Sequence, residues 1–130
     1  MIMIKGQTNS ITIEVKKQHL ANVVGSGELE VLATPAMIAF MEKAASQLVS
    51  DQLEEGQTSV GTLMNVEHTS ASPLGMKVTV TATVTGVDGR KIDFEVIARD
   101  EKGEIGKGVH TRFIVDSQRF MSKVSAKLEK

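Results

Sequence analysis

Residues 34–53, TPAMIAFMEKAASQLVSDQL, decide the fold because they form the strongest helical segment of the chain. At about 100° per residue, their apolar side chains gather on one side of a helix. These side chains are Ile38, Met41, Ala45, Leu48 and Val49. Thr34 is expected as the N-cap and Pro35 as the first helical residue, since proline lacks the amide hydrogen that would be unpaired there. We expect the helix to run to about Glu54 and to stop before Gly56.

Glu42 interrupts the apolar side of this helix. On the helical wheel it falls about 20° from Val49 and about 20° from Leu53, inside the apolar stripe. A carboxylate loses favourable hydration when it leaves water, so one that faces a core needs a partner or a chemical role. The alternative is a long side chain that reaches solvent from the margin of the stripe or pairs with a basic residue.

The rest of the chain has the period of two that is typical of strands. Residues 11–16 alternate before the helix, and residues 60–68, 76–85, 92–98 and 104–115 alternate after it. In the first of these later strands we expect one face to carry Val60, Thr62, Met64, Val66 and His68. The next two strands carry apolar faces of Val78, Val80, Ala82 and Val84, and of Ile92, Phe94, Val96 and Ala98. Asp88-Gly89 is a strong hairpin signal between them, and residues 117–130 are weakly helical in pattern.

One strand, one long helix and four antiparallel strands in a meander predict an α+β hotdog fold, in which the sheet wraps around the central helix. With 130 residues, the chain has the length of a single domain, which we expect to span residues 1–130. The free edges of such a sheet favour association with a second copy.

Composition excludes several classes of protein. The net charge is −1 with scattered basic residues, so we expect no nucleic-acid partner. No cysteine is present, and the three histidines lack metal-ligand spacing with acidic neighbours, so we expect no metal site. There is no apolar run of signal-peptide or membrane-spanning length, so we expect a cytoplasmic protein without a membrane partner.

Glu42 and His68 are the candidate reactive pair. A helix that lies on a sheet brings an inward carboxylate close to an inward imidazole, an arrangement that suits a nucleophile or a general base. Each residue also has a simpler interpretation. Thr34 is explained as a helix cap, although its hydroxyl also lies beside free amides that bind an anion or a carbonyl oxygen. A solitary histidine on an apolar face is often structural.

The segment GKGVHTRF, residues 106–113, is the other candidate region. Two glycines within a strand usually mark a bulge or the close approach of another backbone or a ligand. Arg112 has the rigid fork that suits phosphate or carboxylate, but an exposed arginine paired with Glu or Asp is the alternative. By alternation His110 shares the face of Arg112, opposite Val109 and Phe113.

Taken in order, four stretches resemble one known family. They are residues 31–42 (VLATPAMIAFME), Ser59-Val60-Gly61, Val66-Glu67-His68 and residues 106–113. This ordered set resembles the fluoroacetyl-CoA-specific thioesterases, a branch of the hotdog-fold acyl-CoA thioesterases. The resemblance implies hydrolysis of acyl-CoA through Thr34, Glu42 and His68, with Gly61 at the substrate carbonyl and Arg112 toward the CoA end. It also implies a homodimer or a dimer of dimers, and no cofactor besides the CoA of the substrate.

The chain departs from the family pattern ahead of the helix. No aromatic residue occurs between Gln18 and Ala39, the stretch expected to supply the lid and pocket walls. We therefore expect a short or medium acyl group rather than one halogenated substrate. The alternatives are a non-catalytic hotdog module that binds acyl-CoA and, within enzymes, a dehydratase acting on hydroxyacyl thioesters. A scaffold protein is also compatible with the fold, but it leaves Glu42 unexplained.

Overall fold

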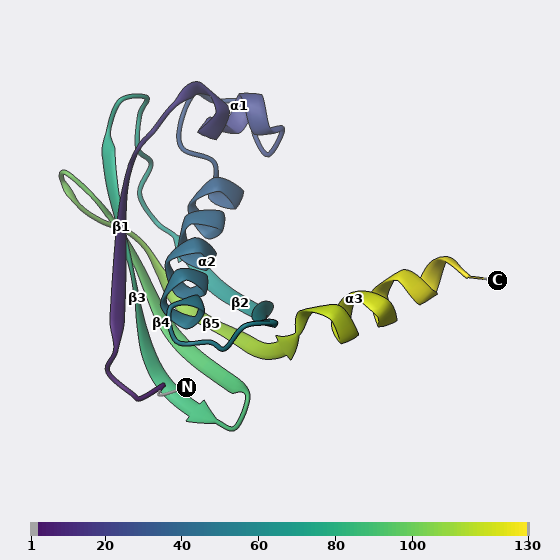
Figure 1. Cartoon of the computed structure of the whole chain (residues 1–130). Coiled ribbons are helices and arrows are strands. Elements are labelled where there is room, and N and C mark those ends of the chain that lie inside the picture. Colours follow the sequence, from purple (N-terminus) through teal and green to yellow (C-terminus); the bar gives the residue numbers. More distant parts are fainter. Residues whose placement is uncertain (1–2, 130) are drawn as a thin grey trace.

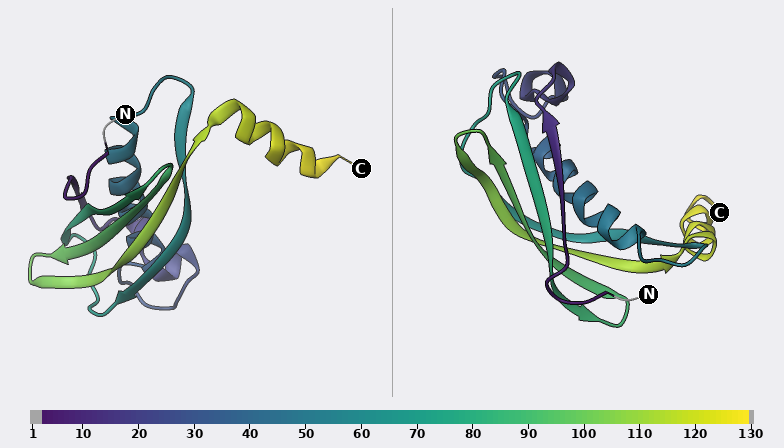
Figure 2. Two further views of the ribbon diagram at one scale, coloured as in Figure 1. Left: turned by 90° about the horizontal axis from the view of Figure 1, so that it is seen from below. Right: turned by 60° about the vertical axis from the view of Figure 1, so that its left-hand side comes forward.

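A five-stranded antiparallel sheet curves around the helix α2 (Thr34–Ser50), as Figures 1 and 2 show in a computed structural model that describes residues 3–129. The order of the strands in the sheet is β1-β3-β4-β5-β2, which confirms the predicted hotdog architecture. The strands are β1 (Thr8–Glu14), β2 (Gln57–His68), β3 (Lys77–Asp88), β4 (Lys91–Asp100) and β5 (Gly103–Asp116).

The core lies between α2 and the concave face of the sheet. The fully buried side chains of the helix are Met37, Met41, Ala44, Ala45 and Val49. They meet the two apolar faces predicted for β3 and β4, all of whose members are buried. The helix ends at Ser50 rather than at Glu54, because residues 51–56 turn directly into β2 and Gly56 takes a positive φ of 88° there.

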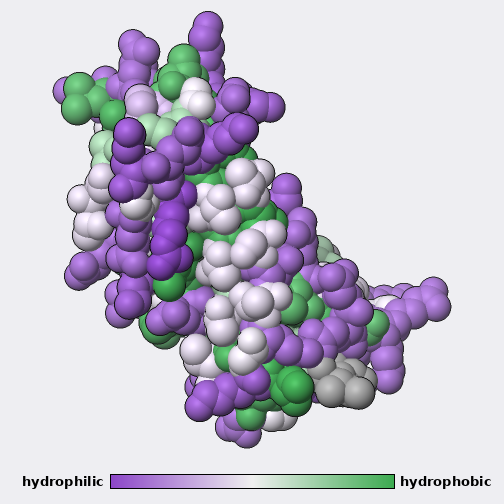
Figure 3. All heavy atoms as spheres, turned by 90° about the vertical axis from the view of Figure 1, so that its left-hand side faces the viewer, coloured by the Kyte–Doolittle hydropathy of each residue, from purple (hydrophilic) through white to green (hydrophobic). Residues whose placement is uncertain are grey.

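The outer face of the sheet is polar. Hydroxyl pairs join β1 to β3 along this face, and each pair has its oxygens within 3.3 Å; they are Thr8–Thr83, Ser10–Thr81 and Thr12–Thr79. Figure 3, which looks at this side of the molecule, shows a column of near-neutral side chains bordered by hydrophilic ones. The clean alternation of β3 therefore separates a buried valine face from a solvated hydroxyl face.

The predicted four-strand meander was wrong in one respect, since β2 pairs with β5 and not with β3. Only β3, β4 and β5 follow one another, with the predicted hairpin at Asp88-Gly89 between the first two. The chain from 69 to 76 is much longer than a hairpin turn, so β3 is free to leave β2 and pair with β1 and β4. As a result β2 is an edge strand with one unpaired side.

A bulge in β2 changes which of its side chains face the helix. The register with β5 shifts between Gly61 and Leu63, so Thr62 is the extra residue. Gly61 therefore faces α2 together with Met64, Val66 and His68. The prediction that Val60 and Thr62 share a face with His68 was wrong for this reason, because alternation alone cannot anticipate an inserted residue.

Short helices flank this body. The segment before α2 contains a 3₁₀ turn (Lys17–His19) and α1 (Ala21–Val24), which carry too few residues for a periodic signal. The helix α3 (Ser117–Ser125) follows β5, with the Asp116 side chain accepting a hydrogen bond from the Arg119 amide at 2.9 Å. It projects away from the sheet in Figure 1. Within residues 3–129, no helix is long and apolar enough to cross a membrane.

Gly108 marks a close approach between β5 and β2, as its position within a strand suggested. A Cβ atom there would overlap the Asn65 carbonyl oxygen and the Cα of Val66. We expect Gly108→Ala to lower the free energy of unfolding by about 2–3 kcal/mol, since overpacking forces the backbone to shift. Gly86→Ala is the matched control within a strand, because the nearest atom to its Cβ would be Asp93 Oδ2 at 3.7 Å. Urea denaturation measures both, and equal losses would contradict the close packing.

Candidate functional site

Thr34 and His68 form the first of two polar clusters beside α2. Thr34 Oγ1 lies 2.8 Å from His68 Nδ1, so the start of the helix is joined to the end of β2. The prediction that Thr34 is the N-cap was wrong. Ala33 occupies that position with extended backbone, and no side chain caps the helix. The Thr34 hydroxyl is therefore committed to the imidazole rather than to the helix amides.

The second ring nitrogen of His68 is available for chemistry. His68 Nε2 is buried and has no hydrogen-bond partner among the residues that the structure describes. Burial lowers the pKa of His68 below 6.5, and the Ser70 backbone opposes this change. A neutral imidazole with a free nitrogen can accept or relay a proton at neutral pH. His68 and Thr34 line a pocket of about 380 Å³.

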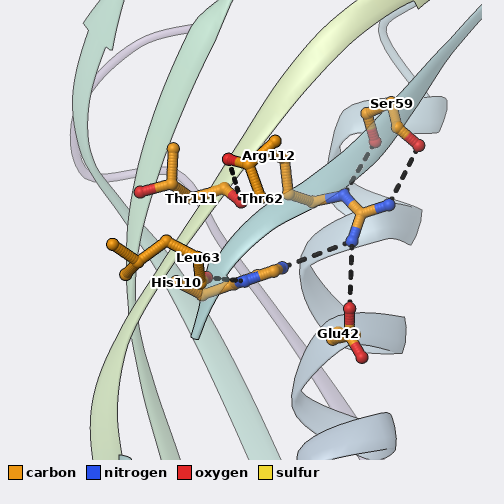
Figure 4. Close-up of polar contacts among 7 residues, drawn as sticks. All are labelled: Glu42, Ser59, Thr62, Leu63, His110, Thr111 and Arg112. Carbon is orange, nitrogen blue, oxygen red and sulfur yellow. Dashed lines mark hydrogen bonds and ion pairs between the residues drawn. The ribbon is translucent and has the colours of Figure 1, made fainter. Parts of the chain in front are cut away.

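Glu42 belongs to a second cluster, with Gly61, His110 and Arg112, and Figure 4 shows its polar contacts. Glu42 Oε2 lies 3.9 Å from Arg112 Nη1, and the two side chains are 45% and 8% exposed, respectively. Glu42 therefore lies at the margin of the apolar stripe and not inside it. Its carboxylate faces a pocket of about 190 Å³ that Gly61 also lines.

Only glycine allows the Glu42 carboxylate to lie so close to β2. A Cβ atom at position 61 would be 2.9 Å from Glu42 Oε2 and 3.1 Å from the His110 ring. The bare backbone at the bulge therefore forms one wall of the second pocket. A backbone amide in such a position is suited to hold a carbonyl oxygen that gains negative charge.

Arg112 is buried, so the alternative of an exposed surface arginine is wrong. Its Nε donates to Ser59 Oγ at 2.8 Å, and its Nη2 donates to the Ser59 carbonyl oxygen at 3.0 Å. Burial lowers the pKa of Arg112, and the negative charge of Glu42 opposes that change. A buried guanidinium is tolerated because its donors are satisfied and a carboxylate lies nearby.

Sequence reasoning gave no role to Ser59 or His110, yet both contact Arg112. His110 Nε2 is 3.3 Å from Arg112 Nη1, and its Nδ1 is 2.8 Å from the Leu63 carbonyl oxygen. Alternation had correctly put His110 on the face of Arg112. Ser59 stands in a family-like stretch beside Gly61, but the sequence did not indicate its contact with Arg112, because that contact depends on the pairing of β2 with β5.

Among residues 3–129 of one chain, no hydrogen bond or ion pair joins the two clusters. Thr34 and Glu42 are eight positions apart on α2, which corresponds to about 12 Å along the helix axis. Gly61 and His68 are seven positions apart on β2. The structure thus brings Thr34 to His68, and Glu42 to Gly61 and Arg112, but it does not bring Glu42 to His68. Among residues 3–129, no group of three or more His, Cys, Asp or Glu side chains could hold a metal ion.

Comparison with known sequences gives a consistent match. Residues 15–118 match the family model described as fluoroacetyl-CoA-specific thioesterase. The chain is 42% identical over 98 residues to the fluoroacetyl-CoA thioesterase of Streptantibioticus cattleyicolor. That alignment covers 75% of this chain and 70% of the relative.

Solved structures agree with this match. The fluoroacetyl-CoA thioesterase FlK is 34% identical and superposes with a TM-score of 0.92 over 98% of both chains. A variant of FlK in complex with acetyl-CoA is 32% identical with a TM-score of 0.92, over 97% of this chain and 99% of that one. A hot-dog-like protein from Thermanaerovibrio acidaminovorans has a TM-score of 0.89 over 97% of this chain and 93% of its own. Its 24% identity bears on the fold alone.

The two buried imidazoles predict a pH dependence of stability. The pKa of His68 and the pKa of His110 are both below 6.5, chiefly because burial penalises the charged ring. Below pH 6.5 the unfolded chain therefore binds more protons than the folded one, so stability is lost as pH falls. We expect the free energy of unfolding to rise between about pH 5 and pH 7.

Urea denaturation across this range measures the slope. The doubly substituted His68→Gln, His110→Gln protein should have a smaller slope than wild type, and His19→Gln is the control because it leaves both imidazoles in place. An identical slope in the double variant would contradict this origin.

Proposed function

The chain belongs to the fluoroacetyl-CoA-specific thioesterase family and is an acyl-CoA thioesterase, and we propose that it hydrolyses a short or medium acyl-CoA through Glu42, Thr34 and His68. One observation carries the assignment of Glu42. Its half-exposed carboxylate lies beside the bare backbone of Gly61, in a pocket, with a buried arginine 3.9 Å away. This is where a nucleophile and a carbonyl group would meet.

Hydrolysis of a thioester needs little general-acid catalysis. The leaving group is a thiolate whose conjugate acid has a pKa of about 8.5, so it departs readily. The enzyme must supply a nucleophile and stabilise a developing oxyanion. In the proposed mechanism Glu42 attacks the thioester carbon or activates a water molecule, and the Gly61 amide holds the oxyanion. The Thr34–His68 pair orients the thioester or supports hydrolysis of an acyl-enzyme intermediate.

A second copy of the chain would complete this site. The unpaired edge of β2 is available for antiparallel pairing with β2 of another copy. A two-fold axis at Asn65 would set Met64 opposite Val66 of the partner subunit, so that residues facing the helices lie opposite each other. The extra residue Thr62 would then bring Gly61 opposite His68 of the partner subunit. Opposite residues in such a pair have Cβ positions about 5 Å apart. The proposed dimer thus joins the two clusters that one chain keeps apart.

The acyl group is proposed to enter the pocket of about 380 Å³ beside Thr34 and His68. Its walls include small side chains and no phenylalanine; among them are Ala21, Ser26, Val31 and Ala71. This lining supports a short or medium acyl chain without an aromatic gate over it. We place the enzyme in the cytoplasm, with acyl-CoA as its substrate and CoA as the carrier.

The proposal predicts release of free CoA from a panel of acyl-CoAs that includes acetyl-CoA, fluoroacetyl-CoA and medium-chain thioesters. Glu42→Gln should lower kcat by about 100-fold or more, the usual contribution of such a group. Glu55→Gln, at an exposed glutamate outside both pockets, is the matched control. A thiol-reactive dye measures the CoA.

Other outcomes of this experiment contradict the proposal. Equal inactivity of wild type and Glu42→Gln would defeat it, and tight binding of intact acyl-CoA without thiol release would indicate a binding module. Enoyl absorbance with a 3-hydroxyacyl-CoA would indicate a dehydratase.

The proposed dimer is tested at the β2 edge. Asn65 lies at the proposed axis opposite its own copy, and the exposed Leu63 lies two positions away, so Leu63→Lys with Asn65→Lys would gather four like charges around the axis. We expect light scattering to give twice the chain mass of 14.0 kDa for wild type and a single chain mass for the double variant, with loss of activity. Val109→Lys is the control, because Val109 is exposed on the neighbouring inner strand β5. A monomeric wild type with full activity would overturn the shared site.

A further inference from the structure

His110 is a buried, titratable member of the second cluster, and the proposed chemistry does not use it. Its Nε2 contacts Arg112 and its Nδ1 contacts the Leu63 carbonyl oxygen of β2. It is 1% exposed, and its ring stacks on Phe94 with the centroids 5.9 Å apart. Figure 4 shows the ring between the β2 backbone and Arg112. A buried imidazole that is held on both sides has a fixed orientation and a fixed protonation pattern.

The Leu63 carbonyl sets the tautomer of His110. A carbonyl oxygen can only accept, so His110 Nδ1, at 2.8 Å from it, carries the proton. The other nitrogen, Nε2, then presents a lone pair. Arg112 Nη1 lies 3.3 Å from that nitrogen and donates to it.

Hydrogen bonds to Nε, Nη2 and Nη1 hold the Arg112 guanidinium in place beside Glu42. Ser59 holds its Nε and Nη2, and His110 takes one of the two hydrogens on Nη1. The remaining Nη1 hydrogen is left for Glu42 Oε2, which lies 3.9 Å away. Because the guanidinium is planar and rigid, the contacts with Ser59 and His110 together determine where Nη1 of Arg112 meets the carboxylate, and His110 is the one that holds Nη1 itself.

His110 also holds the bulge against which Glu42 lies. The ladder between β2 and β5 shifts register between Gly61 and Leu63, and the Leu63 carbonyl at this point accepts from the His110 ring. A Cβ atom at Gly61 would lie 3.1 Å from His110 Cε1, so the ring also packs against the glycine. One side chain thus fixes both the backbone wall of the pocket and the arginine beside the carboxylate.

We propose that neutral His110 is a positioning residue that fixes the Glu42 carboxylate through Arg112 and fixes Gly61 through the Leu63 carbonyl. This inference rests on the proposed role of Glu42 in thioester hydrolysis. Protonation of Nε2 would remove the acceptor and set two cations 3.3 Å apart. The charged groups that face the ring are Arg112 from β5 and Glu42 from α2, while Met64 and Phe94 face it from β2 and β4.

The pKa of His110 agrees with this arrangement. Burial lowers it below 6.5, with a further lowering by the charge of Arg112, while the Leu63 carbonyl and the charge of Glu42 oppose the shift. The ring is therefore neutral at pH 7, and the proposed arrangement is lost as the pH falls through the lowered pKa of the ring. An acid limb in the pH profile of kcat follows from this loss.

Three substitutions separate the functions of the two nitrogens. His110→Asn keeps a donor for the Leu63 carbonyl but loses the acceptor for Arg112. His110→Gln keeps an acceptor near the position of Nε2, and His110→Phe keeps only the ring that stacks on Phe94. We expect His110→Asn and His110→Phe to lower kcat by about 10- to 100-fold, the cost of misplacing a reacting group. KM should change less than kcat, and His110→Gln should retain more activity, with its acid limb at lower pH.

His19→Gln is the matched control, because His19 contacts Phe40 and lies outside both clusters. Full wild-type kcat and an unchanged pH profile in folded His110→Asn and His110→Phe would overturn the positioning role, while CoA release by wild type would still support the proposed function. Wild type that is inert toward every acyl-CoA defeats the proposed function itself.

A second measurement needs no variant that might fail to fold. Nitrogen-15 NMR of the wild-type histidine side chains should find the His110 proton on Nδ1 at pH 7. A proton on Nε2 would overturn the inference whatever the activity.

Discussion

Both polar clusters depend on the burial of one face of α2 in the concave face of the sheet. That contact removes the methionines and alanines of the helix and the valines of β3 from water, which is the dominant source of stability in such a domain. Because the helix is pressed along the sheet, its start lies beside the end of β2 and its middle lies beside the bulge. The polar residues thus hold positions that apolar packing has set.

The sequence allowed prediction of those parts of the fold that rest on periodicity alone. The alternation from Val78 to Ala98 shows which faces of β3 and β4 are buried, and the helical spacing of residues such as Met41 and Val49 predicts the single long helix. The bulge at Thr62 could not be predicted, because one inserted residue leaves no trace in a pattern of period two. For the same reason the contacts of Gly61 with Glu42 and His110 were not foreseen. The pairing of β2 with β5 could not be predicted either, because it depends on how all five strands compete for partners.

The candidate site shows the same division between local and non-local causes. The residue types were visible in sequence, since Glu42, Arg112 and two glycines in a strand each break a local rule. Their partners were not visible: Arg112 meets Ser59 and His110, and Thr34 meets His68 instead of capping its helix. A buried arginine needs several acceptors at once, and only the paired strands bring them together.

The bulge in β2 also limits how this protein can change during evolution. Surface segments usually accept insertions and deletions, but a strand tolerates them poorly because each added or lost residue exchanges its two faces. Loss of Thr62 would turn either Gly61 or His68 away from α2. The side chain at this exposed position makes one long hydrogen bond, 3.4 Å from Thr62 Oγ1 to the Thr111 carbonyl oxygen, whereas deletion of the position itself would dismantle one half of the site.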